Sequence, residues 1–289
     1  MNAWAEVVRI LAEDKELREL IIAPNAPMVS PRAEGCKVIG NSVFSAADVQ
    51  ETLTTAATHA SGRRSGDQGQ SGILCLGLQD VGRIHISYFM QRGSRVIRIV
   101  RVPFDVPTID TVCANQMQVR ELVQAIGALR HKTLLVYGSS HMANSQFIYA
   151  ILDGLNNTHR QVIFIAERML SFLLSHDNSI VIQVEVPIDA PSLEDAIQNA
   201  FLLEPDVAYL GDIRVADELP SLPELINAVP CTILSTVGDS PSLLLERLPK
   251  SLHQNLVERG TAMLLNVRTG DDDKLQVEIH PWPPLKEPK

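Results

Sequence analysis

A short stretch in the middle of the chain has the organisation of a phosphate-binding loop. Residues 134–155, LLVYGSSHMANSQFIYAILDGL, comprise an apolar run, a small-residue loop that starts at Gly138, and an apolar segment with helical periodicity. In the GxxxxGK[ST] motif, backbone N–H groups of such a loop cradle phosphates and the lysine reaches the outer phosphates. Ala143 and Asn144 hold the positions of the second glycine and the lysine. The setting predicts a nucleotide-binding loop whose chemistry is altered.

The altered positions would weaken a phosphate site in two ways. His141, Met142 and Ala143 place side chains where glycine lets the backbone approach phosphate. Loss of the lysine removes a charge-assisted contact worth about 1.5–3 kcal/mol. Ser145 keeps a hydroxyl suited to Mg²⁺, so weak ATP or ADP binding and a purely structural strand-turn-helix both remain open. The residues of this degenerate loop are Gly138, Ser139, Ser140, His141, Met142, Ala143, Asn144, Ser145 and Gln146.

A second group of charged residues flanks an apolar run at residues 200–214, AFLLEPDVAYLGDIR. Glu204 and Asp206 precede the run, and Asp212 and Arg214 follow it. Taken alone, the pattern predicts a capped helix, a turn, and a buried strand that ends in an exposed ion pair.

The first hundred residues predict a unit of mixed helices and strands. An amphipathic helix opens the chain, and a second helix is expected at residues 46–60. Alternating and β-branched apolar runs predict strands at residues 73–78, 82–90 and 95–102. The polar, glycine-rich segment at residues 61–71 is expected to form a mobile loop or a hairpin tip.

The remaining chain alternates apolar strands with helices. The proline-bearing segment VPFDVPTID interrupts the pattern near residue 102, which predicts two domains, residues 1–101 and residues 102–289. Alternation of this kind predicts an α/β fold with a mostly parallel sheet covered on both faces. The expected helices are residues 115–129, 145–155, 192–202 and 243–260, and the expected strands are residues 133–138, 161–166, 181–186, 207–213, 231–236, 261–268 and 274–282.

Composition excludes several classes of protein. A formal net charge of -9 and a pI near 5.4 argue against nucleic acid as a partner, because binding phosphate backbones needs clustered Lys and Arg. Runs long enough for a membrane span are missing from the sequence, and the eight histidines lack the spacing of a metal site, so no metal is expected. The four cysteines are far apart without CxxC pairing, so a cytoplasmic location is the default expectation.

Four segments in this order and spacing resemble one family: GSSHMANSQ, VIFIAER, LLEPDVAYLGDIR and TILSTVGDSPSLLLERL. They are similar to segments of the hexameric ATPases that power type IV pili and type II secretion, especially the pilus retraction ATPases, in which GPTGSGKST, a strand ending in IEDP, LREDPDVILVGEMRD and GTLHTSSA are typical. The resemblance covers nearly the whole chain. It implies an N-terminal α/β (PAS-like) sheet domain and a C-terminal RecA-like domain of the P-loop NTPase type, with a mostly parallel sheet.

Against the family pattern, the positions that would perform hydrolysis are changed. IEDP becomes IAER, so Ala166 replaces the first acid and Glu167 stands in place of the aspartate. Asp212 replaces the glutamate of VGEMR, and Ser235 replaces the histidine of TLHT. Phosphoryl transfer depends almost wholly on positioning and electrostatics, so several simultaneous changes make hydrolysis improbable. No catalytic residues are therefore expected, and Glu167, Asp212 and Ser235 are the degenerate equivalents.

The resemblance also implies how such a chain would act. In active relatives, one subunit of a six-fold ring meets the nucleotide site of the next, and the candidate arginines for such a contact are Arg83, Arg98 and Arg214, with His85 in place of another arginine. The expected function is that of an inactive or severely impaired homologue, a pseudo-ATPase, that regulates or supports a type IV pilus or type II secretion motor. A slow genuine ATPase and a nucleotide sensor that does not hydrolyse are the alternatives.

Expected partners are a pilus or secretion motor ATPase, another protein of the pilus machinery, or copies in a homo- or hetero-oligomeric ring. A bacterial, cytoplasmic protein, peripheral to the inner membrane through its partners, fits this expectation. Its only expected cofactor is weakly bound ATP or ADP with Mg²⁺.

Overall fold

The chain consists of two compact units, Met1–Phe104 and Asp105–Lys289. The computed structural model describes residues 3–32, 35–60, 69–103, 105–128, 132–214, 219–250, 252, 256, 262–270, 272 and 274–282. Most of the predicted loop at residues 61–71 lies outside these described residues.

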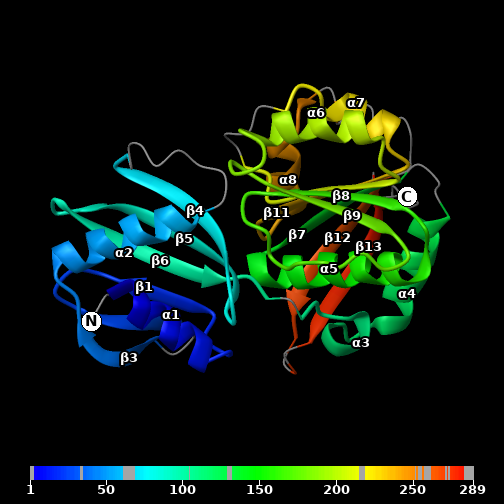
Figure 1. The fold of residues 1–289 in the computed structure, drawn as a ribbon. Helices are drawn as coiled ribbons and strands as arrows, with labels where there is room; N and C mark the ends of the chain where they lie inside the picture. Colours follow the sequence, from blue (N-terminus) through cyan, green and yellow to red (C-terminus); the bar gives the residue numbers. More distant parts are fainter. Residues whose placement is uncertain are drawn as a thin grey trace. The chain divides into compact units, whose positions relative to one another are not determined.

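The first unit is a six-stranded antiparallel sheet with two helices on one face (Figure 1). In sheet order the strands are β3 (Gly35–Val43), β2 (Pro27–Arg32), β1 (Glu19–Ile22), β6 (Ser94–Arg101), β5 (Gly82–Gln91) and β4 (Ser71–Leu78). The helices are α1 (Ala3–Glu13) and α2 (Ala46–His59). Alternate residues of β5, namely Ile84, Ile86 and Tyr88, join the core beneath them.

A reciprocal cap fixes the start of α2. The Ser45 hydroxyl accepts a hydrogen bond from the Asp48 backbone N–H at 3.2 Å, and the Asp48 carboxylate accepts one from the Ser45 N–H at 2.7 Å. These two bonds satisfy donors that a helix end otherwise leaves unpaired, so the sequence SAAD specifies the helix start.

The second unit is built on a seven-stranded sheet in the order β13-β12-β7-β11-β10-β8-β9. All neighbouring pairs are parallel except β12 and β13, which form an antiparallel pair. The predicted α/β fold with a mostly parallel sheet is therefore confirmed. The strands are β7 (Lys132–Gly138), β8 (Val162–Glu167), β9 (Ile180–Glu185), β10 (Val207–Leu210), β11 (Cys231–Val237), β12 (Ala262–Thr269) and β13 (Leu275–Trp282).

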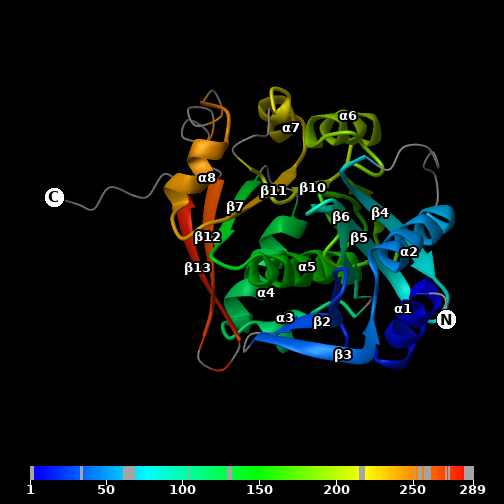
Figure 2. The same cartoon turned by 90° about the vertical axis from the view of Figure 1, so that its left-hand side faces the viewer.

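Helices cover both faces of this sheet, as Figures 1 and 2 show. Along β7, Leu134 and Val136 enter one apolar core, whereas Leu135 and Tyr137 enter the other, because successive side chains of a strand point to opposite faces. One face carries α3 (Ile109–Val112), α4 (Gln116–Gly127) and α5 (His141–Thr158), and the other carries α6 (Leu193–Leu203), α7 (Leu222–Ala228) and α8 (Pro241–Arg247). Within the described ranges, no helix has the length and apolar character of a membrane span.

Two predicted elements differ in the structure, because one is shorter and the other is interrupted. The strand expected at residues 207–213 ends at Leu210. The helix expected at residues 243–260 begins at Pro241 and ends at Arg247, close to Pro249, whose ring cannot continue a helix. Beyond Pro249, Lys250, Leu252 and Leu256 are again helical, and the other residues of that predicted helix lie outside the described residues.

Candidate functional site

The candidate site of the second unit lies where β7, β11, β10 and β8 end. Gly138 is opposite Val237 in the pairing of β7 with β11, and Leu210 is opposite Ala166 in the pairing of β10 with β8. In open α/β sheets, ligands bind beyond the carboxyl ends of the strands. The tertiary structure thus gathers at one sheet edge the predicted loop and the predicted residues Glu167, Asp212 and Ser235.

The loop between β7 and α5 is very short. Only Ser139 and Ser140 separate the two elements, and the helix begins at His141, not at Ser145 as predicted. The Ser140 hydroxyl caps the helix by accepting a hydrogen bond from the Ala143 backbone N–H at 3.2 Å. In a phosphate-binding loop the residues after the first glycine form a cradle before the helix starts, whereas here the helix has already begun at His141.

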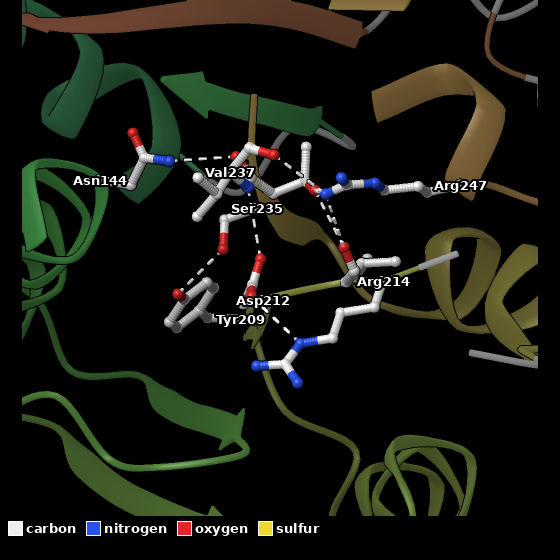
Figure 3. Close-up of polar contacts among 9 residues, drawn as sticks. Asn144, Tyr209, Asp212, Arg214, Ser235, Val237 and Arg247 are labelled. Atoms are coloured by element: carbon white, nitrogen blue, oxygen red, sulfur yellow. Dashed lines mark hydrogen bonds and ion pairs between the residues drawn. The ribbon is translucent and has the colours of Figure 1, made fainter. Parts of the chain in front are cut away.

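Asn144 stands at the position of the lysine in the GxxxxGK[ST] motif, and its side chain is hydrogen-bonded within the protein. Its side chain is 3% exposed, and its amide donates to the backbone carbonyl of Thr236 at 3.1 Å and to that of Gly138 at 3.5 Å (Figure 3). The side chain therefore joins the first turn of α5 to the end of β11.

Close packing around Asn144 also explains Gly138. A Cβ atom at Gly138 would lie 2.3 Å from the backbone oxygen of Val267 and 2.5 Å from the Asn144 side-chain oxygen. Both distances are far below contact, so only glycine fits beside β12. Glycine is therefore required at this position for the close packing of β7 against β12.

The other loop residues divide into exposed and buried positions. His141 and Met142 are exposed, whereas Ser145 is 1% exposed and Gln146 is half-buried. The Ser145 hydroxyl lies 2.9 Å from the Ser171 hydroxyl. The Ser145 hydroxyl is therefore buried and hydrogen-bonded inside the protein.

Glu167, at the end of β8, is a buried carboxylate whose oxygens are fully used. It is 1% exposed and accepts four hydrogen bonds, two on each oxygen. The donors are the Tyr149 hydroxyl at 2.7 Å, the Ser171 N–H at 3.0 Å, the Tyr209 hydroxyl at 3.1 Å and the Ser171 hydroxyl at 3.2 Å. A carboxylate offers about four lone-pair sites. Both oxygens of Glu167 are therefore held by donors of the protein.

Burial and hydrogen bonds act on the protonation of this cluster in opposite directions. Burial raises the pKa of Glu167, and the hydrogen bonds from Tyr149 and Ser171 lower it in part. Burial and the nearby Glu167 carboxylate raise the pKa of both Tyr149 and Tyr209 well above its usual value. The tyrosines therefore act as hydrogen-bond donors.

The two tyrosines are site residues that the sequence did not single out. The Tyr209 hydroxyl lies 3.1 Å from the Ser235 hydroxyl, and the rings of Tyr149 and Tyr209 meet edge to face at 6.4 Å. Ser235, at the position of the family histidine, is 4% exposed. A signal was available, since a tyrosine within an otherwise apolar helix face or strand needs a hydrogen-bond partner when buried.

Asp212 is the acidic residue of the site that keeps contact with solvent. Its side chain is 17% exposed and accepts hydrogen bonds from the Val237 N–H at 3.3 Å and from Arg214 at 3.4 Å. Arg214 is 61% exposed, so the predicted ion pair forms at the surface. Such pairs contribute little to stability.

Arg247 of α8 is a third site residue that the sequence did not indicate. Its guanidinium group donates to the backbone carbonyls of Ile213 at 3.3 Å and Val237 at 3.1 Å, and to the Thr236 hydroxyl. Figure 3 shows Asn144 and Arg247 approaching the end of β11 from opposite sides. An arginine in the last turn of a short helix carries no distinctive sequence signal.

The two remaining predicted arginines lie in the first unit. Arg98 on β6 forms a two-fold hydrogen-bonded ion pair with Glu19 on β1, at 2.6 and 2.8 Å. Arg83 on β5 is half-buried, and His85 on the same strand is 1% exposed. Their contribution to a neighbouring subunit's site stays a prediction.

Comparison with known proteins gives sequence relatives of one kind. The chain is 23% identical over 141 residues to the type IV pilus ATPase PilU of Pseudomonas aeruginosa. The aligned region covers 49% of this chain and 36% of PilU. It is 25% identical over 134 residues to the type IV pilus retraction ATPase PilT of the same organism. This second aligned region covers 46% of this chain and 38% of PilT. These matches span little more than a third of each relative's length. No protein-family model matches the chain.

Similar folds cover almost the whole chain. A crystal structure of the pilus retraction motor PilT with bound ADP matches with a TM-score of 0.76 at 18% identity, over 97% of this chain and 83% of that one. The ATPase DotB of Legionella pneumophila matches with a TM-score of 0.67 at 14% identity, over 96% and 80% of the two chains.

The chain therefore has a two-unit α/β fold like that of the pilus retraction motor PilT and the ATPase DotB. In fold, and over about half of its sequence, the chain is thus similar to type IV pilus motor ATPases.

Proposed function

We propose that this chain is a component of a type IV pilus or type II secretion machinery that has lost ATP hydrolysis and acts by binding a motor ATPase. The position of Asn144 carries the proposal. A lysine there would extend its charge towards a phosphate, whereas the Asn144 amide is neutral, buried and bonded to the carbonyl of Thr236. A charge-assisted contact worth about 1.5–3 kcal/mol is thereby replaced by an internal link.

Three further features support loss of hydrolysis. The helix starts at His141, so its first turn occupies space that a phosphate cradle needs. Protein donors surround both oxygens of Glu167, and the Ser145 hydroxyl is buried next to Ser171. These residues do not fit Mg²⁺ and a nucleotide triphosphate as a catalytic site requires. A subunit with such a site would join or cap a motor ring and tune its assembly or activity.

The alternatives are a slow genuine ATPase and a nucleotide sensor, and one observation favours testing them. Asp212 is partly exposed at the same sheet edge, and its carboxylate accepts only the Val237 N–H and the weak contact from Arg214 among described residues. It therefore keeps acceptor capacity that Glu167 has lost.

Titration calorimetry with ATP and with ADP, each with Mg²⁺ and carried to millimolar ligand, tests the proposal first. We expect no saturable binding, together with retention of a purified pilus retraction ATPase on the immobilised protein. Turnover that is abolished in Asp212→Ala would establish the slow motor instead. Saturable nucleotide binding without turnover would establish the sensor. A protein that neither binds nucleotide nor retains the pilus retraction ATPase would contradict the adaptor function.

A further inference from the structure

Helices α3, α4 and α5 of the second unit pack on one another (Figure 1). A small cavity lies at their junction. Its volume is about 270 Å³. The residues that line it include Ile109, Asp110, Arg120, Val123, Asp153 and Gly154. Asp153 follows Asn144 by nine residues along α5, about 14 Å of helix, so the cavity is separate from the loop at the helix start.

One of the two carboxylates beside the cavity is neutralised by a cation and the other is not. Arg120 donates to both oxygens of Asp110, at 2.5 and 2.6 Å. Asp153 is half-buried and is hydrogen-bonded to the neutral side chain of Asn157, and among described residues no lysine or arginine is paired with it. Burial raises the pKa of Asp153, and the nearby acid Asp177 raises it further. Because no lysine or arginine of the described residues is paired with Asp153, the cavity offers a carboxylate that a cation from a partner can neutralise.

The helical glycine beside Asp153 keeps the cavity open. A Cβ atom at Gly154 would meet Ile109 and Val123 at 3.6 Å, which is ordinary van der Waals contact. Packing thus permits alanine there, and alanine would favour the helix. Glycine at this position has no local structural justification, and its effect is to leave space between apolar walls.

We propose that this cavity is an anchor pocket for a lysine or arginine side chain of a partner protein. The aliphatic stem of such a side chain would pack against Ile109 and Val123, and its charge would pair with Asp153. The volume of about 270 Å³ is below the roughly 300–1,000 Å³ of sites for whole small molecules, which favours a single side chain as occupant. A basic partner surface also complements a chain of net charge -9. The pocket is independent of whether nucleotide binds at the sheet edge.

The proposal is tested with Nα-acetyl-lysine methylamide as a probe of the side chain, titrated into the full chain labelled with ¹⁵N. We expect saturable shifts of the Ala150, Asp153 and Gly154 amide signals. The norleucine analogue, which has the aliphatic stem without the charge, is the matched ligand control and should give shifts at least tenfold smaller at equal concentration.

Two variants and one control variant complete the test. Asp153→Asn removes the charge with little change of shape, and Gly154→Leu fills the space, so each should abolish the saturable shifts. Glu224→Gln, on the opposite face of the sheet, should leave them unchanged, and thermal unfolding of each variant reports whether it is folded. Equal shifts in wild type and Asp153→Asn would overturn the proposal. Shifts with free n-pentylamine but none with the capped lysine would also overturn it, in favour of a small-molecule amine.

Discussion

The Asn144 amide donates to the backbone carbonyl of Thr236 at 3.1 Å and so ties the start of α5 to the end of β11. This link stands where related motor ATPases are expected to hold a lysine. A residue that would bind ligand in a relative therefore supports the sheet edge in this chain. Glu167 and Ser145 are likewise hydrogen-bonded within the protein.

Restoring the loop is expected to restore nucleotide affinity. In the triple variant Asn144→Lys, His141→Gly and Ala143→Gly, the two glycines free the first turn of α5 and the lysine supplies the missing charge. We expect calorimetry to show affinity for ATP with Mg²⁺ higher by roughly ten- to hundredfold. Asn144→Ala is the control, because it breaks the link to Thr236 without adding charge and should not raise affinity. Unchanged affinity in the triple variant would show that the loop has left phosphate-binding geometry.

Removing Glu167 is expected to cost stability. In Glu167→Ala the hydroxyls of Tyr149 and Tyr209 lose a buried acceptor and a cavity forms, so the free energy of unfolding should fall by about 3 kcal/mol. Urea denaturation followed by circular dichroism measures the change. Glu224→Ala, at an exposed position of α7, should change stability by less than about 0.5 kcal/mol. A stable Glu167→Ala protein would mean that the carboxylate is kept for another purpose.

The buried tyrosines are expected to make stability fall at alkaline pH. The pKa of both Tyr149 and Tyr209 is raised well above 10 in the folded protein, so above pH 10 the unfolded chain releases these protons while the folded chain retains them. Their contribution is fully present below about pH 10 and is lost as the pH rises further.

Urea denaturation at pH 8, 9, 10 and 11 checks this prediction against the double variant Tyr149→Phe and Tyr209→Phe. Cys231, whose pKa burial raises to about 12, contributes to the same decline but is present in both proteins. The difference between the two curves therefore isolates the tyrosines, and we expect the variant to lose less stability between pH 10 and 11. Parallel curves would contradict the prediction.

Two glycines of the second unit should respond to alanine in opposite ways. Gly138→Ala forces a methyl group against the Val267 backbone oxygen, which cannot move without displacing β12, so we expect a loss of about 1–3 kcal/mol. Gly154→Ala meets only ordinary contacts within a helix and should gain about 0.5–1 kcal/mol. Thermal and urea unfolding of the pair measures both changes, and equal signs would contradict the assigned packing.

Periodicity predicted most elements of the fold from sequence. The buried strand VIFIA and the helix LEDAIQNAFLL have the apolar spacing of their kind, and Ser45 and Asp48 carry a capping box, so local residues specify them. The start of α5 could not be predicted from local sequence, because His141, Met142 and Ala143 are compatible with either a loop or a helix. The hydrogen bond from the Ala143 N–H to the Ser140 hydroxyl fixes the helical start.

By itself, the sequence determined the α/β class, the resemblance to secretion and pilus motor ATPases, and which of their expected site residues are replaced. Only the tertiary structure decided what the replacements do. Asn144 meets Thr236, and Glu167 meets Tyr149 and Tyr209, across separations of 92, 18 and 42 residues. Spacing along the chain does not encode such contacts, because they depend on which strands become neighbours in the sheet and on which side chains are buried between it and α5.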